Sequence, residues 1–343
     1  MSHIKFAGIV SISSTGKQDT VESQTTVTRL AAIPMMHVLL MLLTAGTASA
    51  QNFPAKPIRI VTSQTGGLND LTARVIAQAL SGTLGKQVIV DNRGAIAIDI
   101  VAKAPADGYT LLCYANNFWL LPFLQEKVSF DPLKDFAPLT LAVTAPNVLA
   151  VHTSVAASSV KELIALARGR PGALNYGAGA TAGTPHLAGE LFKAMAQVNI
   201  VHIAYKGTGP ALTALLGGET HMMFAVPGSV EPHVKTGRLK TLAVTSRAPS
   251  ALAPGLPTLS ESGLPGYEAT AMIALLSPAN TPAPVVNLLN REIVKILNLP
   301  EVKDRMLAAG TEVIGSSPGQ LTQIMKSEMP KWEKIIRQAG IKA

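Results

Sequence analysis

Cysteine is almost absent from this sequence: Cys113 is the single one in 343 residues. No intrachain disulfide can form, so an oxidising compartment would cost the fold nothing. Cys113 lies within the apolar stretch YTLLCYA and does not follow a cleavage site, which excludes a lipid anchor on an N-terminal cysteine. Neither disulfide bonding nor lipid attachment is therefore expected.

Aromatic and charged residues are also scarce, at 4% and 15% of the chain, whereas 48% of the residues are hydrophobic. This composition is typical of a compact α/β protein and not of a disordered chain. The formal net charge is +8, but the basic residues are scattered singly and form no block interleaved with aromatics. We therefore expect no nucleic-acid partner, and only a mildly positive field that favours small anionic ligands.

The apolar run near the N terminus is too short to span a membrane. Its centre, Val38 to Leu43, is preceded by Pro34 and His37 and falls well under the roughly 20 apolar residues that a span requires. Ala48-Ser49-Ala50 follows, which is the small-x-small pattern that signal peptidase cleaves. We expect residues 1–50 to be a signal peptide, cleaved near Ala50, and the mature protein to be periplasmic.

Catalytic and cofactor motifs are missing too. The sequence has no His-Glu-x-x-His and no Gly-x-Gly-x-x-Gly, no Walker lysine follows the glycine loop at 177–183, and PGSVEP around Ser229 lacks the Gly-x-Ser-x-Gly pattern. His186, in HLAGE, is expected to form a hydrogen bond at a helix start, and Ser229 is expected to cap a helix. We expect no enzyme activity, no cofactor and no metal site; a secreted hydrolase or isomerase that uses Asp70 or His186 is the alternative from another class.

From Ala55 onward, strand-like and helix-like segments alternate. Residues 68–84 carry apolar side chains at the spacing of one helix face, and Gly85 is expected to end that helix. Continuous apolar strands between helices predict an α/β fold with mostly parallel sheets. At this length we expect two lobes with a ligand cleft between them, one of residues 51–150 plus 275–343 and one of residues 151–274.

Four loops at strand ends combine small residues with hydroxyl or amide groups ahead of a predicted helix. They are TSQTGGLND (62–70), GAGATAGT (177–184), AYKGTGP (204–210) and FAVPGS (224–229). Ligands of open sheets bind at the carboxyl ends of strands, and helix N termini attract anions. The first loop is equally typical of a plain capping turn. Together, the four loops predict a cleft surrounded by backbone donors that suit a carboxylate.

These segments resemble the Bug-type extracytoplasmic solute receptors of tripartite tricarboxylate transporters. The resemblance runs from about Lys56 to Lys342 and rests on motifs in a fixed order, among them GGLNDLTARVIAQALSGTLGKQVIVDNR, PADGYTLL, HIAYKGTGPALTALLGGETHMMF and PTLSESGLPGYEA. It implies a two-lobed periplasmic-binding-protein fold of type II that closes on a small carboxylate-bearing ligand, an organic acid or an amino acid. It also implies a monomer that presents the ligand to a membrane permease; a ligand-sensing adaptor to a membrane sensor is the alternative role.

The resemblance also implies which residues bind the ligand. Carried over by position, they are Gln64, Thr65, Gly66, Gly67, Asp70, Asn116, Gly179, Thr181, Gly183, Thr184, Tyr205, Gly207, Ala225, Pro227 and Ser229. Several positions depart from the family pattern, among them two stretches near the first loop. Thr62-Ser63 stands where the family usually has Pro-Phe, and the loop after Arg93 is shorter and nearly free of glycine.

Overall fold

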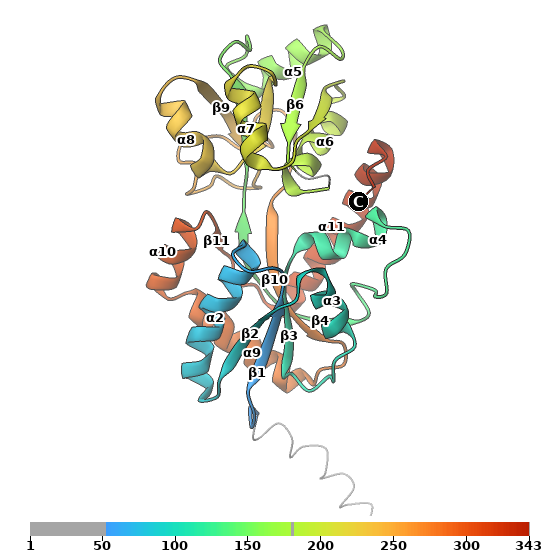
Figure 1. The fold of residues 1–343 in the computed structure, drawn as a ribbon, viewed down its shortest axis with the longest axis vertical. Coiled ribbons are helices and arrows are strands. Elements are labelled where there is room, and N and C mark those ends of the chain that lie inside the picture. Colours follow the sequence, from blue (N-terminus) through green and yellow to red (C-terminus); the bar gives the residue numbers. More distant parts are fainter. Residues whose placement is uncertain (1–52, 180–181, 343) are drawn as a thin grey trace, which may run out of the picture. The chain divides into compact units, whose positions relative to one another are not determined.

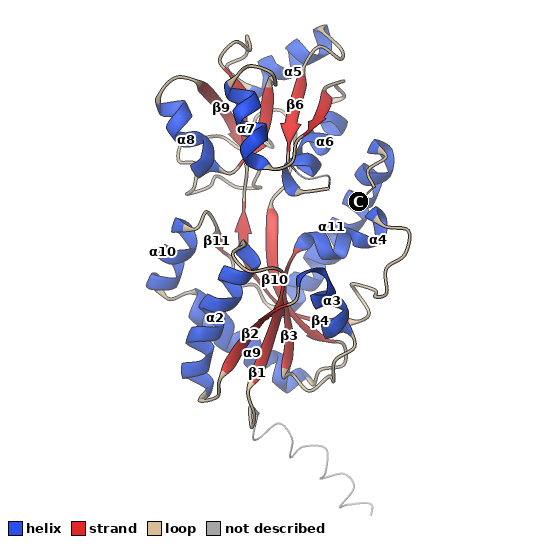
Figure 2. Ribbon diagram, viewed as in Figure 1, coloured by secondary structure: helices blue, strands red, loops and turns tan. Residues whose placement is uncertain are grey.

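The structure is a computed structural model that describes residues 53–179 and 182–342. The predicted signal peptide, residues 1–50, and the predicted ligand residue Thr181 lie outside the described residues. The described chain contains two β-sheets with helices packed on their faces (Figures 1 and 2). Among the described helices, none combines the length and the apolar character that crossing a membrane would require.

The first sheet has six strands in the order β11-β4-β10-β3-β1-β2. Parallel pairs join β1 to β2 and to β3, whereas β10 runs antiparallel to β3 and β4, and β11 antiparallel to β4. The strands are β1 (Ile58–Thr62), β2 (Val88–Asn92), β3 (Thr110–Ala115), β4 (Phe136–Ala145), β10 (Ala271–Pro278) and β11 (Glu312–Val313). The helices that accompany them are α2 (Leu68–Leu84), α3 (Ala97–Ala102), α4 (Leu121–Leu124), α9 (Ala283–Leu297), α10 (Pro300–Ala308) and α11 (Pro318–Ala339).

The second sheet has five strands in the order β7-β6-β8-β5-β9. Strand β6 is parallel to β7 and β8, and β5 is antiparallel to β8 and β9. The strands are β5 (Val148–His152), β6 (Asn175–Ala178), β7 (Val201–Ala204), β8 (Met222–Ala225) and β9 (Leu239–Val244). Its helices are α5 (Val160–Gly169), α6 (Thr184–Ala196), α7 (Thr208–Leu216) and α8 (Pro227–Lys235).

The prediction of mostly parallel sheets is wrong, because both sheets are mixed. Strand β10 carries a continuous apolar run, as a parallel buried strand would, but it enters the first sheet in the reverse direction. A strand that is buried on both faces has the same residue pattern whichever way it runs. Strand β5 begins at Val148 and β10 at Ala271, and the predicted lobe boundaries stay a prediction.

Helix α2 forms where the apolar periodicity predicts it, and Gly85 ends it in the left-handed conformation with φ 63°. That conformation suits glycine because it has no Cβ to clash with the backbone. The segment after Arg93 folds into a 3-10 turn, η1 (Gly94–Ile96), which leads directly into α3.

An aromatic cluster supports the turn that follows β3. This turn, η2 (Asn116–Leu120), places Phe118 and Trp119 in the core, where both side chains are fully buried. Phe118 contacts Trp119 edge-on at 5.4 Å between ring centroids and Phe136 of β4 at 5.5 Å. Because these rings are fixed by packing on all sides, Asn116 at the start of the turn has a rigid base.

Candidate functional site

A cavity of about 400 Å³ lies at the carboxyl ends of β1 and β3 and beside the start of α6. Its wall combines amides and hydroxyls with apolar side chains. The lining residues are Ser63, Asn69, Tyr114, Ala115, Asn116, Asn117, Leu120, Leu121, Leu124, Ala182, Gly183, Thr184, Leu187, Thr270 and Trp332. None of these described lining residues carries a charge, so recognition in this cavity depends on dipoles, hydrogen bonds and apolar contact.

The N terminus of α2 reaches one side of this cavity through Asn69. Its N-cap is Gly67, and no described side chain forms the capping hydrogen bond. The Asn69 amide donates to the hydroxyl oxygen of Ser63 at 3.1 Å, so these two lining residues hold each other in place. The four predicted residues Gln64–Gly67 are exposed in the loop before the helix and do not line the cavity.

Asp70 lies in the first turn of α2, but its carboxylate is used within the protein. Its side chain accepts hydrogen bonds from the Gly66 N–H at 3.0 Å and the Asn92 amide at 2.9 Å, and it pairs with Arg74 at 2.9 Å. Burial alone would raise the pKa of Asp70, but the bonds from Arg74, Gly66 and Asn92 together hold that pKa below its usual value. Asp70 therefore shapes the loop, and its oxygens are already occupied.

The N terminus of α6 forms another part of the wall. Its N-cap is Gly183, again without a capping side chain among the described residues, and Pro185 occupies the first turn. Gly183 and Thr184 both line the cavity, as does Ala182 before them. Unpaired N–H groups and the positive end of the helix dipole make such a terminus attractive to a carboxylate. Two helix N termini thus meet one cavity.

Asn116 and Thr270 form the floor between β3 and β10. The Asn116 amide donates to the Thr270 carbonyl at 3.2 Å and accepts from the Met272 N–H at 3.3 Å. Thr270 is 4% exposed, and its hydroxyl has no hydrogen-bond partner among the described residues. A buried hydroxyl without a partner costs free energy, which a polar ligand group in the cavity would offset.

The three predicted residues Gly179, Tyr205 and Gly207 do not line the cavity. A Cβ on Gly179 would lie 2.6 Å from the Gly207 carbonyl carbon, so a glycine is needed where these two loops touch. The Tyr205 N–H donates to the Ala178 carbonyl at 2.9 Å and extends the pairing of β6 and β7. These residues therefore join the ends of β6 and β7.

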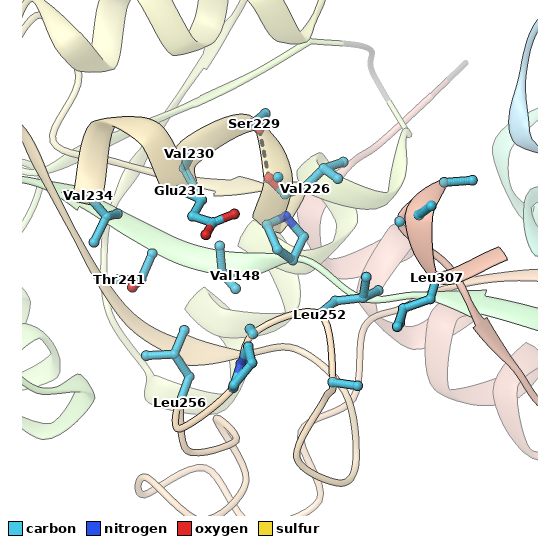
Figure 3. A pocket seen from close by; sticks show the side chains of 18 residues that line it. Val148, Val226, Ser229, Val230, Glu231, Val234, Thr241, Leu252, Leu256 and Leu307 are labelled. Carbon is cyan, nitrogen blue, oxygen red and sulfur yellow. Dashed lines mark hydrogen bonds between the residues drawn. The ribbon is translucent and has the colours of Figure 1, made fainter. Parts of the chain in front are cut away.

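The fourth predicted loop belongs to a different cavity, of about 690 Å³ (Figure 3). Pro227 and Ser229 line it with other residues of α8, together with Leu252 and Leu307, whereas Ala225 is fully buried. The Ser229 hydroxyl donates to the Val226 carbonyl at 2.7 Å, as drawn in Figure 3. The structure therefore brings Asn116, Gly183 and Thr184 to the first cavity and places Pro227 and Ser229 at another.

Sequence reasoning missed the apolar half of the first cavity. Leu120, Leu121, Leu124, Leu187 and Trp332 line it. In the sequence these residues look like ordinary core residues of helices, because nothing in a local apolar pattern tells a cavity wall from a filled core. No group of three or more His, Cys, Asp or Glu residues within the described ranges is arranged to hold a metal ion.

Comparison with known proteins decides the family. A family model described as "Tripartite tricarboxylate transporter family receptor" matches residues 72–341. The chain belongs to this receptor family. Among its relatives, a UPF0065 protein from the tcbD-tcbE intergenic region of Pseudomonas sp. strain P51 is 35% identical over 83% of this chain and 86% of its own. Protein BugT of Bordetella pertussis is 34% identical over 92% of this chain and 98% of its own.

Solved structures agree with this assignment of the receptor. R. palustris Rpa4515 with adipate has a TM-score of 0.67 and 34% identity, covering 84% of this chain and 99% of its own. MatC (Rpa3494) from Rhodopseudomonas palustris with bound malate has a TM-score of 0.64 and 27% identity, covering 83% and 100%. The predicted two-lobed periplasmic-binding-protein fold is thereby confirmed. The receptor belongs to a class of solute-binding proteins and not to an enzyme class.

Proposed function

We propose that this receptor is exported and captures a small dicarboxylate with an aliphatic body in the 400 Å³ cavity, for delivery to a tripartite transporter permease. One observation carries the proposal: two helix N termini without capping side chains meet a cavity whose described lining is uncharged. A negative guest has no carboxylate to oppose it there and gains backbone N–H groups. The receptor acts as a monomer and performs no chemistry on its ligand.

The strength of binding follows from ordinary hydrogen-bond energies. Each N–H or hydroxyl that is donated to a carboxylate contributes about 1.5–3 kcal/mol. Three or four such bonds supply enough free energy for micromolar binding, about −8 kcal/mol, after the entropy cost of association is subtracted. Closure around the ligand requires contacts from both sides of the cavity, because only differential affinity shifts a conformational equilibrium.

The apolar wall selects among dicarboxylates. Leu120, Leu187 and Trp332 offer hydrocarbon surface to the middle of the ligand and no partner for a hydroxyl there. Each buried methylene contributes about 0.8 kcal/mol, so a four-methylene chain gains over a short hydroxylated one. We expect calorimetric titration of the mature protein to give a Kd for adipate at least about tenfold lower than that for malate.

Thr184→Val tests the placement of that ligand, because it removes a lining hydroxyl and keeps the side-chain shape. We expect it to weaken adipate binding by about five- to tenfold. Thr213→Val is the matched control, since Thr213 lies on α7 away from the cavity and its hydroxyl bonds the Gly209 carbonyl. Equal Kd values of Thr184→Val and the unmutated protein for adipate would place the ligand elsewhere. If neither adipate nor malate binds at millimolar concentration, the proposed class of ligand is refuted.

Export has a separate test. We expect the protein recovered from the periplasm of the host to begin at Gln51, which intact-mass measurement resolves directly. The physical reason is the small-x-small site at Ala48 to Ala50 behind a short apolar run. A full-length mass, or retention of the protein inside the inner membrane, contradicts this part of the proposal.

A further inference from the structure

Two histidines and a tyrosine stack beneath α6. The His186 ring, on α6, lies 4.0 Å from the His202 ring of β7 between centroids, with an angle of 18° between the planes. The Tyr176 ring of β6 lies 4.9 Å from the His202 ring and 6.4 Å from the His186 ring, again between centroids. His186 is 5% exposed, and the Nε2 atom of His202 is buried without a partner among the described residues. These rings are therefore fixed by packing.

The His186 ring connects this stack to the cavity wall. Its Nδ1 accepts a hydrogen bond from the Ala182 N–H at 3.0 Å. Ala182 lines the cavity and has φ 59°, in the left-handed region that residues with a Cβ rarely adopt. A residue keeps such a conformation only where its surroundings hold it there. The hydrogen bond from the Ala182 N–H to His186 Nδ1 holds it there.

We propose that His186 is a positioning residue for the carboxylate site, because its neutral imidazole holds Ala182 and so fixes the segment Ala182–Thr184 at the cavity wall. This inference rests on the proposed function of that cavity. His186 is absent from the cavity lining, so it makes no contact with the ligand. It acts through Ala182 alone. Only an imidazole with a free lone pair on Nδ1 can accept the Ala182 N–H.

The surroundings of His186 keep that lone pair free. Burial is the main cause that lowers the pKa of His186 to about 4, and the neighbouring His202 and Lys193 lower it further, against an opposing effect of Glu190. Burial also lowers the pKa of His202. Glu190 is itself occupied, by the Tyr176 hydroxyl at 2.7 Å and by Lys193 at 2.8 Å. At neutral pH His186 is therefore neutral, and the Ala182 N–H that donates to Nδ1 fixes the tautomer in which Nδ1 is the acceptor.

Two substitutions at this position distinguish the effect of the acceptor atom at Nδ1 from the effect of the imidazole ring. His186→Asn places an amide oxygen near the position of Nδ1, whereas His186→Gln places it near Nε2. Hydrogen exchange of the Ala182 amide in the ligand-free protein reports the bond itself, and calorimetric titration with adipate reports its effect on binding. We expect His186→Asn to match the unmutated protein in both, and His186→Gln to exchange the Ala182 amide at least tenfold faster and to bind adipate about tenfold more weakly.

A pH series supplies the second readout and does not need the glutamine variant to fold. Between pH 5 and pH 3.5 adipate binding to the unmutated protein should weaken more steeply than binding to His186→Asn; comparing the two proteins removes the titration of the acid itself. Equal amide exchange and equal Kd in the asparagine and glutamine variants would overturn the inference, as would identical pH profiles. If the unmutated protein binds no adipate, the proposed function fails, and amide exchange alone decides whether His186 holds Ala182.

Discussion

Replacing Gly189 by alanine is expected to lower the free energy of unfolding by about 3 kcal/mol. A Cβ at this position of α6 would lie 2.3 Å from Cε2 and 2.5 Å from Cζ of Tyr176. The Tyr176 ring cannot move aside, because it is 1% exposed, stacks on His202 and donates its hydroxyl to Glu190. The helix that carries the cavity wall is therefore held at a distance that only glycine allows. Chemical denaturation of the purified protein measures the loss.

Gly82→Ala is the matched control, because Gly82 also lies inside a helix, α2, but a Cβ there would meet nothing within 4 Å. We expect this substitution to raise the free energy of unfolding by about 0.5–1 kcal/mol, the ordinary gain of alanine over glycine in a helix. If Gly189→Ala proved as stable as Gly82→Ala, α6 would not pack on Tyr176 as described.

Acidification is expected to remove about 3 kcal/mol of stability through His186 alone. The pKa of this side chain is about 4 in the folded protein, against 6.5 as its ordinary value. Between these two pH values the unfolded chain takes up a proton that the folded protein does not, so unfolding becomes easier as the pH falls. This contribution of His186 to the free energy of unfolding is fully present above pH 6.5 and is lost progressively as the pH falls from 6.5 through 4. Burial lowers the pKa of His202 and His221 as well, and both act in the same direction.

The His186→Asn variant isolates this contribution, because asparagine does not titrate. Denaturation curves of both proteins, taken at intervals from pH 7.5 to pH 3.5, should show a steeper fall for the unmutated protein, with the difference confined to the range below pH 6.5. Parallel curves across that range would mean that His186 titrates at its ordinary pKa, which its burial and its bond to Ala182 argue against.

Much of the fold could be predicted from periodicity and from single punctuating residues. The apolar spacing of residues 68–84 and the glycine at 85 define α2, and the helix start predicted for Pro185 lies in the first turn of α6. Strand direction could not be predicted, because β10 is buried on both faces and carries no mark of its orientation. Pairing partners are set by contacts between distant segments, which a local pattern does not contain.

The sequence predicts what kind of site this is, but it predicts only some of the residues that line it. Small residues and hydroxyls before α6 indicate an anion loop, and Gly183 and Thr184 line the cavity. The family resemblance implies that Asp70 binds the ligand, yet its carboxylate is bonded to Gly66, Asn92 and Arg74. Whether a polar side chain faces its own loop or a cavity depends on a distant partner. Asn92 is 22 residues away from Asp70 in the sequence, and no motif around Asp70 indicates that the two side chains are bonded.

The central claim is that peptide N–H groups at the starts of α2 and α6 receive a carboxylate in the 400 Å³ cavity. Titration of isotope-labelled mature protein with adipate, followed through the backbone amide signals, tests it most directly. The account predicts saturable changes at Asn69, Gly183 and Thr184, with the same Kd at all three and no comparable change at Ser229. Saturable binding that leaves the signals of both helix starts in place would contradict it.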